Sequence, residues 1–331
     1  MDVPHSLASS RGSRADDLIV VFTKNSLGRL EQTLPKMIRH DFSIVVLDDS
    51  SSSVTRDQMD AWPNVTYHGK NEQTEFLAAI DDTGLKDFVC PLGEEAWRLG
   101  QLRNYALLLG LKMGASSLLM IDDDIVIEDE TLIASTLSLL EKFPIVGANT
   151  LGMPDFSVTG HIESSIGDAP LTFISGQYMA VDLKAVHWSF PNVYNEDWIF
   201  ALLHAIRQPV GRHGVVWQLD YDVASGVVSR ASFQEPGELI CEGVAELLLE
   251  GLDECKLTSE DFWLDILKYR QDLLKNTFKR VPRRSWMATT LSALLRYYDH
   301  ARLYDTLKTL STYLAAQPKW RTGYMMLRER A

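Results

Sequence analysis

Residues 118–127 read LLMIDDDIVI, an apolar run that three consecutive acids interrupt. Such a run predicts a buried β-strand whose acidic end emerges at the edge of a sheet. Strand alternation would place Asp122 and Asp124 on the same side, with Asp123 opposite. Carboxylate oxygens held on one side suit a hard divalent cation such as Mg2+ or Mn2+, with substrate phosphates completing its coordination. The alternative is an acidic turn after a strand.

A second acidic segment follows an earlier strand. Residues 18–22 (LIVVF) and 43–47 (SIVVL) are predicted to be buried strands, and the apolar spacing over 27–38 predicts a helix between them. A strand–helix–strand unit with short connections requires a parallel sheet. Ligands of such sheets bind beyond the carboxyl ends of the strands, where Asp48 and Asp49 lie. We therefore expect an α/β fold in which both acidic segments belong to one site, although 48–53 also suits a solvated turn.

The other elements are predicted from their apolar patterns. Helices are expected over 94–113, 129–143, 198–206 and from Pro236 to 252, and strands over 65–68, 145–148, 173–181 and 214–221. Residues 152–168 are expected to be a loop-rich segment that lines a substrate pocket, and 182–186 to begin a short helix.

Several single residues are candidates for function. Gly176 interrupts its strand and allows close approach of a ligand or of another backbone segment. Arg103 lies on the helix before the triple acid and can neutralise a diphosphate, although it can also be merely solvated. Asp197 begins a helix, where it is either a capping residue or a general base, a role that contributes ~10²–10⁴-fold in rate. His213 is either a metal ligand or a structural histidine.

Composition excludes several classes of protein. The chain of 331 residues is 46% apolar, which allows a sizeable core, and its formal net charge of −13 argues against a general nucleic-acid-binding protein. No apolar run approaches the length of an integral membrane segment. Three scattered cysteines fit reduced thiols in a cytoplasmic protein better than a disulfide framework. Residues 1–17 are predicted to be a flexible leader.

The last hundred residues are predicted to be mostly helical. Glu238, Glu242, Glu246 and Glu250 recur every fourth residue, and like charges at this spacing require a basic partner. The basic segment 279–284 is one candidate. We expect a domain boundary near residue 230, with 231–331 as a helical C-terminal region that can close over an acceptor, form a homodimer or dock a partner protein.

Six segments resemble, in order and spacing, the motifs of family-2-like GT-A glycosyltransferases. They are residues 20–25 (VVFTKN), 46–50 (VLDDS), 103–104 (RN), 121–124 (IDDD), 176–181 (GQYMAV) and 195–198 (NEDW). The second resembles the nucleotide-binding DDGS element, the fourth the DXD motif, the fifth the acceptor-side segment and the sixth the ED motif. The resemblance covers about residues 18–220. It implies a GT-A, Rossmann-like fold: a mostly parallel central sheet flanked by helices, within a nucleotide-sugar-binding and catalytic domain at 18–230.

The resemblance also implies a function and its residues. The chain would be a soluble, metal-dependent glycosyltransferase that uses a UDP- or GDP-sugar donor, Mn2+ or Mg2+, and an acceptor of unknown identity. The implied donor-binding residues are Thr23, Asn25, Asp48, Asp49, Arg103, Asp122 and Asp123. The implied metal ligands are Asp122 and Asp124, and His213 is a further candidate. Gly176, Gln177 and Trp198 would contact the acceptor, Glu196 would orient it, and Asp197 would deprotonate its hydroxyl group, with inversion at the anomeric carbon.

Some features depart from the family pattern, and two other classes remain open. No glycine follows Asp48–Asp49, Gln177 stands where Gly or Asn is common, and 182–184 lack the usual basic residues. The Gln-x-x-Arg-Trp motif of processive synthases is absent, which favours single addition. A sugar nucleotidyltransferase would need a Gly-rich basic loop after the first strand, where 23–29 hold one glycine. A non-catalytic nucleotide-sugar-binding scaffold would be expected to lose the acids.

Overall fold

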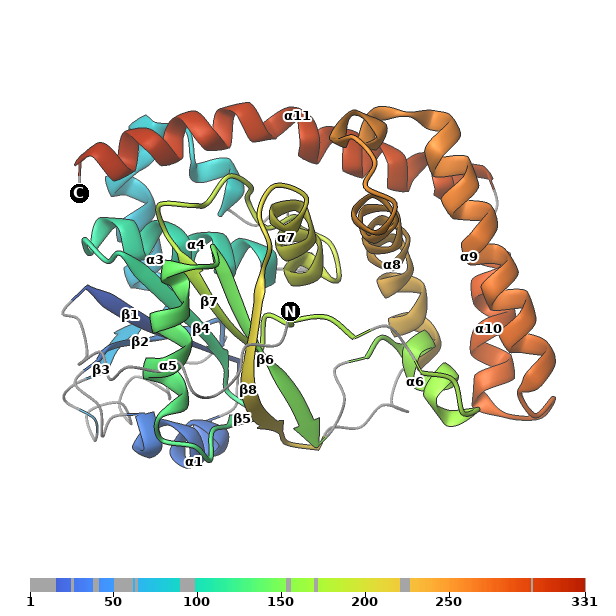
Figure 1. Ribbon diagram of the computed structural model, residues 1–331, viewed down its shortest axis with the longest axis horizontal. Coiled ribbons are helices and arrows are strands. Elements are labelled where there is room, and N and C mark those ends of the chain that lie inside the picture. Colours follow the sequence, from blue (N-terminus) through green and yellow to red (C-terminus); the bar gives the residue numbers. More distant parts are fainter. Residues whose placement is uncertain are drawn as a thin grey trace.

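The computed structural model describes residues 16–24, 27–37, 42–50, 62, 65–89, 99–152, 156–169, 172–220, 227–298 and 300–330. Within these residues, eight strands form one sheet in the order β3-β2-β1-β4-β7-β6-β8-β5 (Figure 1). The strands are β1 (Asp17–Thr23), β2 (Ser43–Asp48), β3 (Val65–His68), β4 (Ser117–Asp122), β5 (Ile125–Val126), β6 (Ile145–Gly152), β7 (Tyr178–Asp182) and β8 (Gly211–Gln218).

Helices occupy much of the remaining described chain. They are α1 (Leu27–Met37), α3 (Lys70–Ala79), α4 (Leu99–Lys112), α5 (Leu132–Ser138), α6 (Val158–Ser165), α7 (Glu196–Ala205), α8 (Val227–Leu249), α9 (Glu260–Arg280), α10 (Trp286–Tyr297) and α11 (His300–Arg330). None of the described helices combines the length and the apolar composition that crossing a membrane requires.

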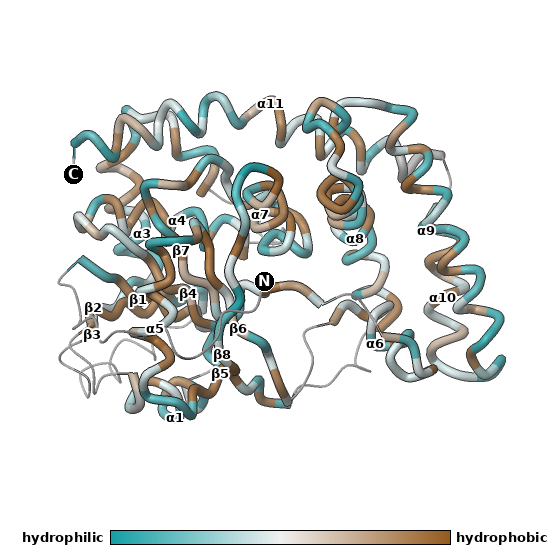
Figure 2. Tube along the Cα trace, in the orientation of Figure 1, coloured by the Kyte–Doolittle hydropathy of each residue, from teal (hydrophilic) through white to brown (hydrophobic). Residues whose placement is uncertain are grey.

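Parallel pairing dominates the half of the sheet that carries the acidic segments. Among the described strands, the parallel pairs are β1–β2, β1–β4, β2–β3 and β6–β8, and the antiparallel pairs are β4–β7, β6–β7 and β5–β8. The core strands are continuous apolar runs because helices cover both faces of the sheet. Figure 2 shows these apolar residues gathered along the strands.

Two hydrophobic cores lie on the two faces of the sheet. One side of β1, including Leu18 and Val20, packs in a core with residues of α4, α7, α8 and α11. The other side, including Ile19 and Val21, packs with residues of α1 and α5. This arrangement follows from the alternation of side chains along a strand. It confirms the predicted α/β fold, with its mostly parallel sheet between helices.

The C-terminal helices extend the molecule beyond the sheet. α8, α9 and α10 lie to one side of α7, and α11 runs back along the molecule toward α4 (Figure 1). Trp320 of α11 is fully buried, and the Tyr324 hydroxyl donates a 2.9 Å hydrogen bond to the Leu183 carbonyl beside β7. The helical C-terminal region is thus confirmed. The division at residue 230 and a homodimer stay predictions, and α8 runs through residue 230.

Four local predictions differ from the structure. Segment 152–168 contains α6 rather than only loop, and 182–186 form a turn closed by the Ala185 N–H on the Asp182 carbonyl. The strand expected at 173–181 begins only at Tyr178. Pro236 lies inside α8 instead of starting it, because the turn before it is held by tertiary contacts: Gln234 accepts a hydrogen bond from the Val158 N–H.

Glu238 and Glu242 of α8 have a basic partner, as the sequence predicts, but the candidate segment 279–284 does not provide it in the described contacts. Arg270 of α9, not segment 279–284, contacts Glu238 and Glu242 together with Glu235. A single buried guanidinium can approach several carboxylates because its donors are arranged as a planar fork.

Candidate functional site

The carboxyl ends of β1, β2 and β4 meet at one edge of the sheet. In the parallel register, Thr23 pairs with Asp48 and Phe22 pairs with Asp122. The Asp49 N–H extends this contact by donating a 3.0 Å hydrogen bond to the Thr23 carbonyl. A pocket of about 320 Å³ lies here, and its lining includes Thr23, Lys24, Arg29, Asp49, Asp122, Asp123 and Asp124. The two acidic segments therefore belong to one pocket.

The three consecutive acids are held by different partners. β4 ends at Asp122, so Asp123 and Asp124 belong to a turn, where the predicted alternation of sides does not apply. Arg29 Nη1 lies 3.5 Å from Asp123 Oδ1 and 3.6 Å from Asp124 Oδ2. Thr23 donates a 2.6 Å hydrogen bond to Asp123. Burial raises the pKa of Asp123, and the neighbouring charge of Asp124 adds to the shift, while Thr23 and Arg29 oppose it.

Asp48 and Asp49 have separate roles. Asp48 is buried and shapes the turn: its Oδ1 accepts a 2.8 Å hydrogen bond from the Ser50 N–H and another from the Ser50 hydroxyl. Its Oδ2 accepts a 2.8 Å hydrogen bond from the Tyr67 hydroxyl. Asp49 lines the pocket, 3.3 Å from Lys24 Nζ. The side chain of Asp48 thus closes a turn that lacks the glycine of the DDGS element that it resembles.

Arg103 links the pocket to α7. Its side chain is 2% exposed, its Nη2 lies 3.5 Å from Asp122 Oδ2, and its Nε lies 3.3 Å from Glu196 Oε1. Its guanidinium also lies 5.7 Å from the centroid of the Phe22 ring. A Cβ atom on Gly176 would lie 1.3 Å from Arg103 Nη1, so this position requires glycine. Arg103 is not among the described residues that line the pocket. It contacts one acid at the end of β4, Asp122, and one at the start of α7, Glu196.

The segment before β7 contacts both Asp197 of α7 and Asp122 of β4. The Gly176 N–H donates a 2.5 Å hydrogen bond to Asp197 Oδ2, and the Gln177 carbonyl accepts a 3.0 Å hydrogen bond from the Asp122 N–H. Asp197 is mostly buried at the start of α7. Asn195, directly before this helix, adopts a left-handed conformation with φ of 60°, which turns the chain into the helix. Asp122, Glu196 and Asp197 are thereby brought together.

The other predicted residues have different surroundings. The Trp198 ring packs edge-on against Phe173, with 5.9 Å between ring centroids. His213 Nε2 lies 2.9 Å from the Ser135 hydroxyl of α5, and Asn25 lies outside the described residues. Gln218, not His213, is the residue of β8 that contacts Asp124, at 3.2 Å. Because Gln218 is five residues farther along the strand, roughly 15 Å, His213 does not lie with the three acids.

The sequence interpretation missed Lys24 and Arg29 as pocket residues. Lys24 follows β1 directly and Arg29 lies in the first turn of α1. A basic residue after the first strand is a signal for phosphate binding that the sequence carries. Both side chains line the pocket, and Arg29 remains 38% exposed. They are the described cations of the pocket that a bound anion can reach.

The donor set of the pocket fits a metal that is shared with a substrate. No group of three or more His, Cys, Asp and Glu side chains converges as a metal site in the described part of the chain. Asp124 and Asp123 nonetheless both present carboxylates to the pocket. Mg2+ commonly binds one or two carboxylates, with waters and substrate phosphates as its other ligands. The oxygen donors present therefore suit Mn2+ or Mg2+ together with a diphosphate.

No protein-family model and no curated protein matches the sequence. Among solved structures, the mannosyltransferase PcManGT from Pyrobaculum calidifontis, in complex with GDP-Man and Mn2+, is 17% identical with a TM-score of 0.48, covering 95% of this chain and 90% of that chain. A putative nucleotide-diphospho-sugar transferase from Desulfovibrio desulfuricans G20 is 10% identical with a TM-score of 0.37, covering 80% and 99%. Mouse xyloside xylosyltransferase 1, apo form, is 14% identical with a TM-score of 0.33, covering 52% and 69%. All three TM-scores are below 0.5, so these likenesses do not assign a function.

Proposed function

We propose that the chain is a metal-dependent glycosyltransferase that moves a sugar from a nucleoside-diphosphate donor to an acceptor hydroxyl group. The observation that carries this proposal is the connection Asp122–Arg103–Glu196, which fixes the acids of the pocket beside the first turn of α7. The pocket provides oxygen ligands and two cations at the ends of parallel strands, where nucleotides commonly bind. The adjacent Asp197 provides a carboxylate that can accept a proton.

The residues that line the pocket would bind different parts of the donor. Asp124 and Asp123 would hold the cation, and a cation bound there would stabilise negative charge on the departing nucleoside diphosphate. Arg29 and Lys24 would contact the diphosphate as cations that line the pocket. Asp49 would contact the nucleoside.

Asp197 would be the general base of an inverting reaction. Its Oδ2 is oriented by the Gly176 N–H, which fixes the carboxylate relative to Asp122 through Gln177. The base would take the proton from the acceptor hydroxyl group as the oxygen attacks the anomeric carbon, and the bond to the diphosphate would break on the opposite face. Glu196 would position Arg103 and not take the proton, because its carboxylate faces the guanidinium at 3.3 Å.

Nucleotide binding tests the donor site. A panel of nucleoside diphosphates and nucleotide sugars, with and without Mn2+, is expected to contain one nucleotide that raises the unfolding temperature by a few degrees, since a ligand at 100 times its Kd stabilises by about 2.7 kcal/mol. Asp124→Asn should lose this shift. The matched control is Glu128→Gln, an exposed acid four residues away. If no nucleotide stabilises the folded protein with Mn2+, the proposal is wrong.

Donor hydrolysis tests the proposed base separately. Asp197→Asn keeps an oxygen that can accept the Gly176 hydrogen bond but cannot take a proton. It should retain the nucleotide-dependent thermal shift and lose roughly 10²–10⁴-fold in the rate of nucleoside diphosphate release from the donor. An unchanged rate would exclude Asp197 as the base and leave the donor site intact.

A further inference from the structure

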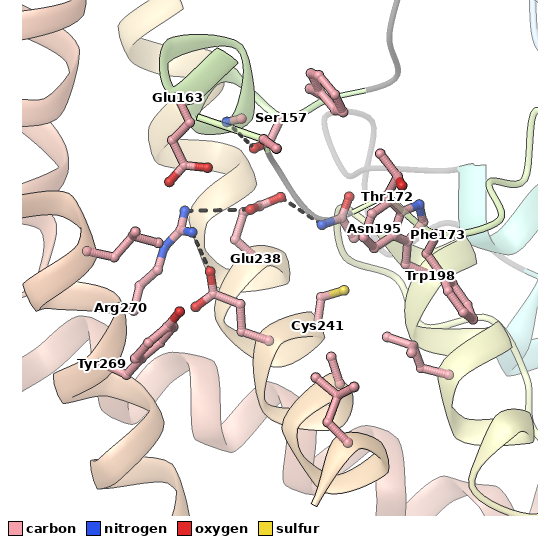
Figure 3. A pocket seen from close by; sticks show the side chains of 18 of the residues that line it. Ser157, Glu163, Thr172, Phe173, Asn195, Trp198, Glu238, Cys241, Tyr269 and Arg270 are labelled. Carbon is pink, nitrogen blue, oxygen red and sulfur yellow. Dashed lines mark hydrogen bonds and ion pairs between the residues drawn. The ribbon is translucent and has the colours of Figure 1, made fainter. Parts of the chain in front are cut away.

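A second cavity, of about 460 Å³, lies among α6, α7, α8 and α9 (Figure 3). Its wall is largely apolar and includes Phe156, Phe173, Trp198, Leu248, Tyr269 and Leu273. Cavities of this size and character bind small molecules, with a few polar groups fixing the ligand's orientation. The polar groups that face this space therefore decide which ligand it can accept.

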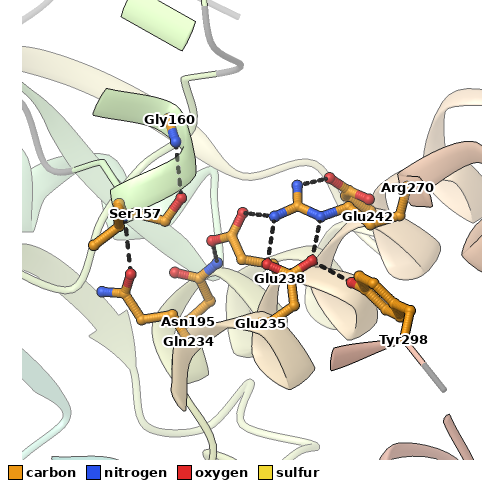
Figure 4. Close-up of polar contacts among 10 residues, drawn as sticks. Ser157, Gly160, Asn195, Gln234, Glu235, Glu238, Glu242, Arg270 and Tyr298 are labelled. Atoms are coloured by element: carbon orange, nitrogen blue, oxygen red, sulfur yellow. Dashed lines mark hydrogen bonds and ion pairs between the residues drawn. The ribbon is translucent and has the colours of Figure 1, made fainter. Parts of the chain in front are cut away.

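The lining of the cavity includes Arg270 and several acids. Figure 4 shows the contacts of Arg270 with Glu235, Glu238 and Glu242. The Arg270 guanidinium binds Glu235 through Nε at 2.7 Å and Nη2 at 2.9 Å, and Glu242 through Nη1 at 2.5 Å. Nη2 also lies 3.6 Å from Glu238 Oε2. One buried cation therefore contacts three carboxylates, of which Glu238 and Glu242 line the cavity and Glu235 does not.

A fourth carboxylate adds to this excess. Glu163 of α6 faces the end of the cavity where Arg270 lies (Figure 3), and its buried Oε1 accepts no hydrogen bond from the described residues. Oε2 of Glu242 is also buried and has no such partner. Burial raises the pKa of Glu163, Glu238 and Glu242, that of Glu242 to about 7, although Arg270 opposes each shift. Arg270 is the one cation among the described residues of the lining, so the carboxylates at this end outnumber it whenever they are ionised.

This charge balance selects the kind of ligand. A protonated amine adds positive charge and brings three hydrogen-bond donors, which suit the buried carboxylate oxygens of Glu163 and Glu242. An anionic group in the same position would be repelled by carboxylates in a medium of low dielectric constant. The apolar wall would cover the rest of such a ligand.

The cavity shares a wall with the proposed reaction site. Asn195 and Trp198, which line the cavity, flank Glu196 and Asp197 in the first turn of α7. Phe173, also in the lining, lies three residues before Gly176, whose N–H orients Asp197. A molecule held in the cavity therefore lies beside the turn of α7 that carries Asp197.

We propose that this cavity binds the acceptor, and that the acceptor has an apolar body and a protonated amine. This inference rests on the proposed glycosyltransferase function. It disfavours acceptors that carry a phosphate or carboxylate group at this end.

Three probes of the same shape test the chemistry of the cavity: 4-phenylbutylamine, 4-phenylbutanol and 4-phenylbutyrate. Binding to the full chain is measured by calorimetry at pH 8, without nucleotide. The amine is expected to bind most tightly, the alcohol more weakly and the carboxylate not measurably. Equal binding of all three probes, or no binding of the amine, would overturn the proposal.

Variants then locate the amine. Glu242→Gln removes one carboxylate charge. It should weaken binding of the amine by about 10-fold or more, as expected for loss of a hydrogen bond to a charged group. Binding of the alcohol should not weaken. The matched control is Glu246→Gln, because Glu246 is an exposed acid one turn farther along α8. This substitution should change the affinity for neither the amine nor the alcohol. Leu248→Trp, which fills the cavity from its apolar wall, should weaken the binding of both the amine and the alcohol. Unchanged amine binding in both cavity variants would place the probe elsewhere and overturn the proposal.

Donor hydrolysis distinguishes this inference from the proposed function. With the amine saturating, nucleoside diphosphate release from the donor should fall several-fold in the native chain, because the probe displaces water near Asp197, and should not fall in Leu248→Trp. An unchanged rate with the amine bound would overturn the acceptor assignment, while nucleotide binding with Mn2+ would still support the donor site. Amine binding without any nucleotide binding would instead refute the glycosyltransferase and, with it, the acceptor role.

Discussion

Glu242→Gln should change how the stability of the protein depends on pH. The Glu242 side chain is 20% exposed, and its pKa is raised from 4.5 to about 7, by burial first and then by Glu238 and Glu235, against the attraction of Arg270. The folded state therefore favours the protonated acid. Its stabilising contribution is complete below pH 4.5 and is lost as the pH rises through about 7.

The size of the effect follows from the shift. A pKa raised from 4.5 to about 7 corresponds to roughly 3 kcal/mol of unfolding free energy. Glutamine stays neutral, so the stability of Glu242→Gln relative to the native chain should increase by up to about 3 kcal/mol between pH 5 and pH 8.5. Urea unfolding followed by tryptophan fluorescence, at closely spaced pH values, measures this difference.

Glu246→Gln is the control for the same measurement, because this exposed side chain on α8 should leave the difference near zero at every pH. The reasoning would be refuted if Glu242→Gln became less stable relative to the native chain as the pH rises. That result would mean that the contact with Arg270 outweighs the cost of burying the charge.

Three further changes have defined outcomes. Gly176→Ala places a Cβ 1.3 Å from Arg103 Nη1 and should cost at least about 2 kcal/mol in urea unfolding, together with most donor hydrolysis; native-like values for both would contradict the described packing. Tyr67→Phe removes the 2.8 Å hydrogen bond to Asp48 and should cost about 1.5–3 kcal/mol, whereas no loss in the same assay would make this contact dispensable. Burial lowers the pKa of His204 from 6.5 to about 4, so the native chain should lose up to about 3 kcal/mol as the pH falls from 6.5 to 4, and His204→Gln should reduce this loss; an equal loss in both proteins would assign it to other groups.

The sheet was predictable because its central strands are continuous apolar runs. Strands β1, β2 and β4 are buried on both faces, so each reads as a short β-branched or aliphatic segment that ends in polar residues. Parallel pairing then requires the carboxyl ends to meet. The order of strands and helices in the sequence therefore predicts that Thr23, Asp48 and Asp122 lie at the same edge of the sheet.

The partners of the acids were less predictable. The spacing of glutamates on α8 indicates that a cation is required, but Arg270 and segment 279–284 satisfy that requirement equally well in the sequence. Only the packing of α9 against α8 places Arg270 between Glu235 and Glu242. The predicted alternation of the three consecutive acids was wrong because β4 ends at Asp122. The alternation of side chains holds only within a strand, and the apolar pattern does not show at which residue the strand ends.

The position of Arg103 favours neither of the two roles considered from the sequence, which were diphosphate neutralisation and simple solvation. A residue that neutralises a diphosphate must present its guanidinium to the pocket, yet the Arg103 side chain is 2% exposed and contacts Asp122 and Glu196. Arg29, at 38% exposure, lines the pocket and contacts Asp123 and Asp124. A buried guanidinium that left its two acids to bind a phosphate would leave their charges uncompensated, which costs several kcal/mol. We therefore infer that Arg103 positions the acids, and that Arg29 and Lys24 would contact a diphosphate in the proposed function.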